Sequence, residues 1–250
     1  MIIELFGPPG VGKTTFAAAL TQAMREHGCA VEPVVSYRPA EQGNGPGGGQ
    51  AVRAVRRVIR PVMETLAAAR RPVRGVNEAG TPAGLLGLLP PRNLMWSIRL
   101  HQYLARLFRS WEAAAAARHA VLFDQAFVQA VASLVLLCRA PDWVLVERAL
   151  DAAPKPDVLI LLNAPLEILE ARLVERQRRQ GRIERLLELD LATNLRTVGI
   201  VDRLHDLLRK RGRTVICVDS TGPDTLRDAA ARIATGLQPA LAPHRAVPAS

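Results

Sequence analysis

Short apolar runs alternate with longer amphipathic segments along the chain. Runs of four to eight mainly apolar residues predict strands, and they lie at 2–6, 30–37, 119–125, within 156–167 and at 213–220. Continuous apolar runs are typical of strands that are buried on both faces, as in a parallel sheet covered by helices. The alternation therefore predicts an α/β fold with a mostly parallel sheet.

Helical periodicity fills the segments between these strands. In 14–27, Phe16, Leu20 and Met24 recur at helical spacing, and Gly28 is a stop signal. Similar patterns predict further helices at 51–71, 92–118, 126–138, 141–150, 166–210 with an interruption around Gly181, and after the last strand. Glycine and proline predict a flexible loop near 43–49 and a broken connection at 75–91.

The pattern predicts one domain over residues 1–236, with a helical insertion at about 38–118. A Pro/Ala-rich tail at 237–250 is predicted to be disordered. The N-terminus has no signal-peptide pattern, and no apolar stretch reaches the roughly 18 residues that a membrane span needs. We therefore expect a cytoplasmic protein without a membrane anchor.

The composition favours anionic partners. The net charge is +10, but only three of the 33 basic residues are lysines. Such an arginine bias can reflect genome base composition, so the charge by itself is weak evidence for nucleic-acid binding. Cys29, Cys138 and Cys217 stand alone, which indicates neither a zinc site nor a disulfide framework.

The segment GPPGVGKT directly after the first predicted strand matches the pattern G-x-x-x-x-G-K-[ST]. In such a loop, small residues let successive backbone N–H groups point at a phosphate, and the following helix adds its positive N-terminal end. Lys13 would reach the β- and γ-phosphates, and the Thr14 hydroxyl would join the shell of a Mg²⁺ ion. The residues expected around the triphosphate are Gly7, Pro8, Pro9, Gly10, Val11, Gly12, Lys13, Thr14 and Thr15.

Asp124 ends the apolar run at 119–125. A carboxylate at the carboxyl end of a parallel strand faces the same crevice as the phosphate loop. There it would hold Mg²⁺ through water or accept a proton from the acceptor, which makes Asp124 a candidate metal and catalytic residue. The alternative is that Asp124 caps the helix that begins near residue 126.

An arginine cluster brackets the break around Gly181, and its members are Arg172, Arg176, Arg178, Arg179, Arg182 and Arg185. On a lid at about 175–185, such side chains would stabilise the charge on a transferred phosphoryl group, with Arg176 and Arg182 as the catalytic candidates. Nearby glutamates leave a second interpretation open, in which the arginines form ion pairs on solvated helices.

In this order, the segments FGPPGVGKTTFAAAL, VLFDQ, PDVLILLNAPLEILEARL and VICVDST resemble P-loop kinases of the thymidylate kinase type, within the nucleoside and nucleotide kinase group. The resemblance implies a three-layer P-loop NTPase fold with about five parallel strands, Mg-ATP as donor and an Arg-bearing lid. It also implies that Arg172 opens the lid against the adenine and that the turn starting at Asp219 closes over the adenine edge.

The chain departs from the family where the acceptor should bind. Gln125 replaces the arginine that follows the strand-end acid, which weakens the case for thymidylate, and the long insertion is unusual. Candidates for binding an anionic acceptor are Arg53, Arg56, Arg57, Arg92, Arg99, Arg106 and Arg109. For each of these arginines taken singly, a solvated face of an amphipathic helix is the favoured interpretation.

These observations together predict an ATP-dependent, Mg²⁺-requiring kinase for a small-molecule acceptor such as a nucleotide or nucleoside. Two alternatives stay open: an ATPase that drives a partner, and a basic nucleic-acid-binding P-loop protein, which is less favoured because aromatic residues are few. The absence of an N-K-x-D motif argues against a GTPase. Assembly as a homodimer is left open.

Overall fold

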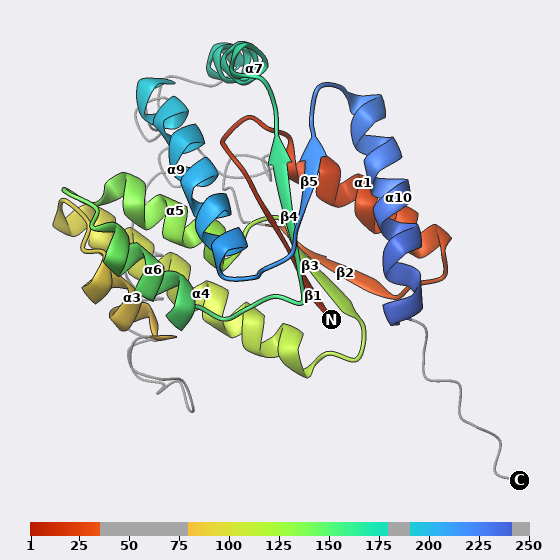
Figure 1. Cartoon of the computed structure of the whole chain (residues 1–250), viewed down its shortest axis with the longest axis horizontal. Helices are drawn as coiled ribbons and strands as arrows, with labels where there is room; N and C mark the ends of the chain where they lie inside the picture. Colours follow the sequence, from red (N-terminus) through yellow and green to blue (C-terminus); the bar gives the residue numbers. More distant parts are fainter. Residues whose placement is uncertain (36–79, 180–190, 242–250) are drawn as a thin grey trace, which may run out of the picture.

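The computed structural model describes residues 1–35, 80–179 and 191–241, and Figure 1 shows their arrangement. Within these residues the chain forms a central sheet with helices on both faces and one helix across its carboxyl edge. The predicted helix at 51–71, the glycine-rich loop and the second half of the predicted lid lie outside the described residues.

The sheet contains five parallel strands in the order β2-β3-β1-β4-β5. The strands are β1 (Ile2–Phe6), β2 (Val31–Val34), β3 (Ala120–Phe123), β4 (Val158–Asn163) and β5 (Val215–Asp219). This confirms the predicted α/β class and the mostly parallel sheet. Because β1 lies between β3 and β4, the segments that follow these three strands begin at the same edge of the sheet.

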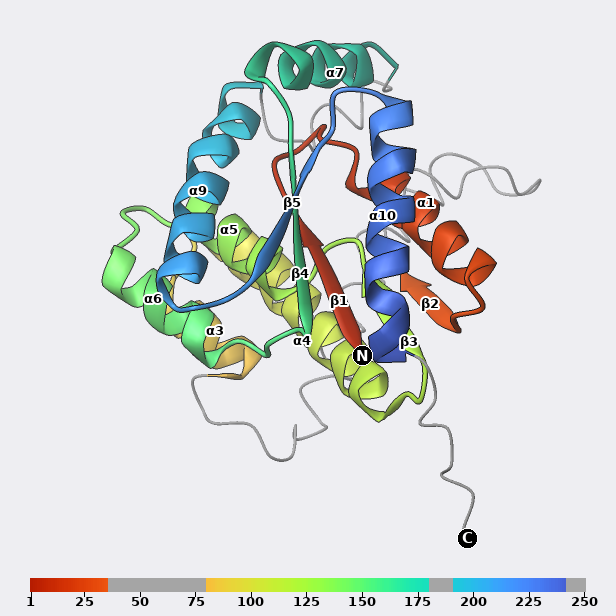
Figure 2. The same ribbon diagram turned by 45° about the vertical axis from the view of Figure 1, so that its right-hand side comes forward.

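Side chains alternate between the two faces of β1. Ile3 and Leu5 pack against α1 (Lys13–Glu26) and α10 (Pro223–Leu241). On the opposite face, α5 (Phe127–Leu137) and α9 (Leu191–Lys210) cover the sheet, and Phe6 packs against both of them. Figure 2 shows α1 and α10 on one side of the sheet and α5 and α9 on the other.

Three further helices pack beside and outside α5. They are α3 (Pro82–Leu88), α4 (Leu94–Ala116) and α6 (Trp143–Ala152), which enclose one large apolar cluster with β1 and β3. Trp111 of α4 contacts Phe123 of β3 at 5.3 Å between ring centroids. The buried side chains of α4 are Leu100, Gln102, Leu104, Leu107, Phe108, Trp111 and Ala114. Leu94 and Ile98 are exposed, because the helix extends beyond the core at its N-terminal end.

The structure differs from the predicted elements at two places. The connection expected to be broken at 75–91 contains α3, because Thr81 caps the helix by accepting a hydrogen bond from Gly84 N at 3.0 Å and Pro82 suits the first helical turn. Helix α10 continues to Leu241, so the first residues of the expected tail are helical. No helix in the described ranges is long and apolar enough to cross a membrane.

Candidate active site

The loop from Gly7 to Thr14 joins β1 to α1 at the carboxyl edge of the sheet. At Gly7, an added Cβ atom would lie 2.4 Å from the backbone oxygen of Leu162, so the close passage of the loop over β4 requires glycine. Gly10 and Gly12 have φ angles of 80° and 94°, which are unfavourable for other residues. The pattern of glycines in the motif therefore has a steric cause in this fold.

Lys13 folds back into the loop. Its ammonium group donates hydrogen bonds to the backbone oxygens of Gly7 at 2.7 Å and Pro8 at 3.0 Å, and the residue is buried. A lysine charge held inside a loop of small residues at a helix N-terminus makes the loop electropositive. This charge is compatible with the phosphate groups of a nucleotide.

Thr14 and Asp124 meet across the site. The Thr14 hydroxyl donates a hydrogen bond to Asp124 Oδ2 at 3.3 Å, although the two residues are 110 positions apart. Asp124 directly follows β3 and is 1% exposed. The interpretation of Asp124 as a helix cap is not supported, because α5 begins at Phe127 with Ala126 at its N-cap position.

The phosphate loop and the turn after β5 are joined by Arg172 of α7 (Leu166–Arg179). One guanidinium nitrogen donates to Ser220 Oγ at 3.1 Å, and the other donates to the Thr221 backbone oxygen at 3.4 Å. The buried Ser220 hydroxyl in turn donates to the backbone oxygen of Val11 at 2.5 Å. Arg172, Ser220 and Thr221 therefore belong to one local network with the loop, and the adenine-binding roles of Arg172 and Asp219 stay predictions.

The predicted lid is described only in its first part. Helix α7 crosses the carboxyl edge of the sheet in both views, and its Leu173 side chain lies against Gly10, 3.2 Å from the position of an added Cβ. Arg176 is partly buried on this helix, whereas Arg182 lies outside the described residues. The roles of Arg176 and Arg182 stay predictions.

Four of the arginines expected to bind the acceptor lie on α4 or just before it, and each has its own local surroundings. Arg99 lies over the ring of Trp96 at 5.2 Å, Arg106 donates to the Gln102 backbone oxygen at 3.4 Å, and Arg92 and Arg109 are exposed. Arg53, Arg56 and Arg57 lie outside the described residues.

Tyr103 reaches the site from the same helix, α4. Its hydroxyl is close enough to the carboxylates of Glu4 and Asp124 for both to raise the pKa of the phenol, in addition to the effect of burial. The helical pattern at 92–118 could not reveal that Tyr103 meets these two acids in the folded chain.

Two polar residues of the site, Gln129 and Glu4, were not among the site residues predicted from the sequence. Gln129, in the first turns of α5, accepts a hydrogen bond from Gly7 N at 3.2 Å. Glu4, in the middle of β1, is completely buried and accepts a hydrogen bond from Val128 N at 2.7 Å. Burial raises the pKa of Glu4 to about 8, against the lowering effect of the backbone N–H groups at the start of α5.

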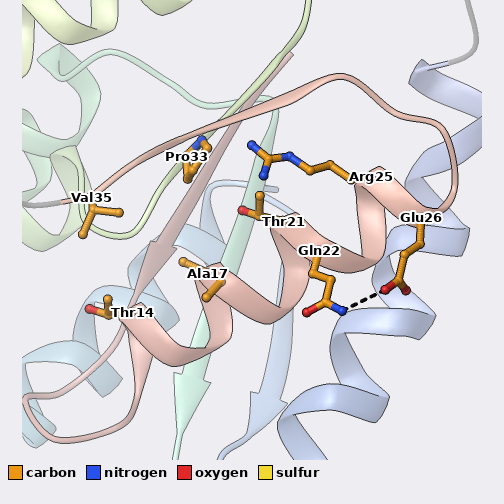
Figure 3. Close-up of a pocket in the computed structure, with 9 residues that line it drawn as sticks. Thr14, Ala17, Thr21, Gln22, Arg25, Glu26, Pro33 and Val35 are labelled. Carbon is orange, nitrogen blue, oxygen red and sulfur yellow. Dashed lines mark hydrogen bonds between the residues drawn. The ribbon is translucent and has the colours of Figure 1, made fainter.

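A pocket with a volume of about 700 Å³ runs along α1 and faces the end of β2. Figure 3 shows Thr14 near one end and Arg25 further along the same helix, with Pro33 and Val35 across from them. The Thr21 hydroxyl is buried among these residues without a hydrogen-bond partner. Because Thr14 also contacts Asp124, the pocket begins beside the phosphate loop.

Comparison of the sequence with models of known protein families gave no match, and comparison with curated proteins gave no significant match. The function of the chain is therefore inferred from the GPPGVGKT motif and from the geometry of the site around Thr14 and Asp124.

The residues present fit a nucleotide with Mg²⁺. A hydroxyl and a carboxylate are typical members of a Mg²⁺ shell, and they lie together beside a loop that fits phosphates. No cluster of three or more His, Cys, Asp or Glu side chains capable of holding a metal occurs among the described residues. Mg²⁺ does not require such a cluster, because it keeps several waters and binds through one or two protein groups together with the phosphates of its substrate.

Proposed function

We propose that this chain is an ATP-dependent kinase with a P-loop NTPase fold that transfers the γ-phosphoryl group to a small-molecule acceptor such as a nucleotide or nucleoside. The contact between Thr14 and Asp124 is the observation that carries the proposal. The motif alone predicts a loop that binds phosphates, whereas this contact adds a strand-end acid at the position where phosphoryl-transfer enzymes need a carboxylate.

Each residue then has a distinct task. The amides of the loop and the Lys13 ammonium bind the β- and γ-phosphates, and Arg172 orders the turn after β5 next to the adenine side of the nucleotide. Thr14 and Asp124 hold Mg²⁺, which supplies neutralisation of the phosphate charge. Asp124 is also the candidate base for the acceptor hydroxyl, and arginines of the predicted lid at about 175–185 stabilise the transferred group.

The pocket along α1 is our candidate for the acceptor. It begins at Thr14, so a molecule in it would present one end to the transferred phosphoryl group, with Arg25 and Glu26 lining the same pocket further along α1. Ala18 lines the pocket and is exposed, so Ala18→Leu should fill the space without disturbing the core. This variant should raise the KM for the acceptor and leave the affinity for Mg-ATP unchanged.

The test is ADP release in the presence of a panel of nucleosides, nucleotides and other small alcohols. We expect at least one acceptor to accelerate ADP release by wild type, and Lys13→Ala to reduce this rate by about a hundredfold or more, since it removes a charge that stabilises the transition state. Lys155→Ala is the matched control, because Lys155 is an exposed lysine just before β4. It should retain wild-type activity.

Full activity of a folded Lys13→Ala variant would contradict the proposal. Rapid ATP hydrolysis that no acceptor changes would favour an ATPase that drives a partner. Tight, steeply salt-dependent binding to RNA or DNA without any phosphoryl transfer would favour the nucleic-acid alternative. The cytoplasmic location stays a prediction from the sequence.

A further inference from the structure

Glu4 is a charged residue in the middle of a buried strand. It pairs with Phe123 of β3 on one side and Leu159 of β4 on the other, and none of its surface is exposed. A carboxyl group in such a position is strongly destabilising unless hydrogen bonds compensate for the loss of water. An apolar residue at this position would allow β1 to form equally well. Strand formation therefore does not explain why the residue is a glutamate.

The start of α5 supplies a partner for one oxygen of this carboxyl group, whereas the other oxygen, Oε2, is buried and has no hydrogen-bond partner among the described residues. Ala126 occupies the N-cap position of α5 and has no side chain that could accept a hydrogen bond from the first turn. Glu4 Oε1 takes that role from the neighbouring strand by accepting the Val128 N–H at 2.7 Å. The backbone N–H groups of residues 126, 127 and 129 also favour the ionised form of Glu4, which places the carboxyl group at the end of the helix.

The start of α5 is connected both to Asp124 and to the Gly7 end of the loop. Asp124 lies three residues before Phe127, the first residue of the helix. Gln129 lies next to Val128 in the chain, and its side chain accepts the Gly7 N–H at 3.2 Å. A closed path therefore runs from Glu4 to the start of α5, through Gln129 to Gly7, and back along β1 to Glu4.

We propose that Glu4 is a positioning residue, which fastens the start of α5 to β1 and so sets the positions of Asp124 and of the Gly7 end of the phosphate loop. The proposal rests on the proposed function in one respect, namely that Asp124 and the loop act together on Mg-ATP. Glu4 itself does not touch the nucleotide, because its side chain is completely buried beneath α5.

The variants that test this role are Glu4→Ala and Glu4→Gln. Glu4→Ala removes the acceptor of the Val128 N–H, whereas Glu4→Gln keeps a carbonyl oxygen at the same distance along the side chain. Asp142→Ala is the matched control, because Asp142 caps α6 by accepting from Val144 N at 2.9 Å, and α6 has no part in the candidate site. It removes a helix cap of the same kind at another place.

The first measurement is amide hydrogen exchange, which needs no nucleotide. Glu4→Ala should increase the exchange rates of Gly7 and of the amides at the start of α5 by about tenfold or more, as expected when a buried hydrogen bond is lost. Glu4→Gln should restore rates close to wild type. Asp142→Ala should affect only the start of α6.

The second measurement is the binding of Mg-ATP and of metal-free ATP. Glu4→Ala should weaken Mg-ATP binding by about tenfold, with a smaller effect on metal-free ATP, since displacement of Asp124 affects the metal most. Glu4→Gln should bind within about twofold of wild type, as should Asp142→Ala.

The two measurements separate failure of the inference from failure of the proposed function. If wild type bound no Mg-ATP, the proposed function would fail, while the exchange rates at Gly7 would still decide whether Glu4 positions the loop. If a folded Glu4→Ala variant kept wild-type exchange at Gly7 and at the start of α5, the inference would be wrong. Equal losses of Mg-ATP affinity in Glu4→Ala and Asp142→Ala would also overturn it, since the effect would then be a general loss of stability.

Discussion

Replacing Glu4 with glutamine should stabilise the protein, and the gain should grow with pH. Burial raises the pKa of Glu4 from 4.5 to about 8 in the folded protein. Between these values the unfolded chain has lost the proton while the folded protein still holds it. The free energy of unfolding of wild type therefore falls as the pH rises from about 4.5 to 8, because the folded state binds the extra proton.

The size of the effect follows from the difference between the two pKa values. Each pKa unit corresponds to about 1.4 kcal/mol, so at pH 7 the ionisation of Glu4 in the unfolded chain lowers the free energy of unfolding by about 3 kcal/mol. The loss approaches about 4 kcal/mol near pH 8 and then levels off. A glutamine has no proton to lose, and its side-chain amide replaces the protonated carboxyl group with the same shape.

Tyr103 on α4 lies close to both Glu4 and Asp124, and Tyr103 and Asp124 stay in place in the variant. Tyr103 keeps its proton across this range, because burial and the two nearby carboxylates raise the pKa of its hydroxyl. Since wild type and variant share Tyr103 and Asp124, the difference between the two proteins isolates Glu4.

The assay is urea unfolding of wild type and Glu4→Gln at pH 4.5, 6, 7 and 8. We expect a difference near zero at the lowest pH and about 3 kcal/mol in favour of the variant at pH 7, or roughly 10 °C in thermal midpoint for a chain of this size. Glu112→Gln, at an exposed position of α4, is the control and should follow wild type at every pH. A difference that stayed constant with pH, or that favoured wild type more at high pH, would refute the reasoning.

Three further substitutions test separate parts of the structure. Gly7→Ala should weaken Mg-ATP binding by about tenfold or more, because its Cβ would lie 2.4 Å from the Leu162 backbone oxygen; calorimetric titration measures this, with Gly87→Ala in α3, whose Cβ would meet nothing within 4 Å, as the control. Ser220→Ala should destabilise the protein by about 1–3 kcal/mol in urea unfolding and loosen Arg172, since it removes the hydroxyl that joins Arg172 to the loop, and an unchanged stability would argue against that network. Leu104→Ala should destabilise the fold by about 2–5 kcal/mol in the same assay, as expected for a completely buried leucine, and a loss below about 1 kcal/mol would contradict the described packing of α4.

Elements of the fold could be predicted from the sequence where a local pattern within one segment determines the structure. The strands β1 and β4 are apolar runs that are buried on both faces, and the glycine pattern of the phosphate loop follows from steric limits that act within a few residues. Helix α3 was missed because its glycines resemble a broken connection, whereas Leu85 is buried in the core and stabilises the helix through tertiary contacts.

Two parts of the candidate site could be predicted from the sequence, namely the loop that includes Lys13 and Thr14, and Asp124. Asp124 could be inferred from its place at the end of a strand, because parallel strands share an edge. The roles of Glu4, Gln129 and Tyr103 could not be inferred, since each depends on which elements pack together across the sheet. A lone glutamate in an apolar strand is a signal in itself, but the sequence does not indicate which helix it caps.

The contact between Thr14 and Asp124 is tested most directly by a double-mutant cycle on nucleotide binding. The affinities of ATP with and without Mg²⁺ are measured for wild type, Thr14→Val, Asp124→Asn and the double variant. The account predicts that Mg²⁺ tightens ATP binding in wild type by about tenfold or more, that each single variant loses most of this gain, and that the double variant loses little more. Additive losses in the two single variants, or an unchanged Mg²⁺ effect in Asp124→Asn, would contradict the proposed metal site.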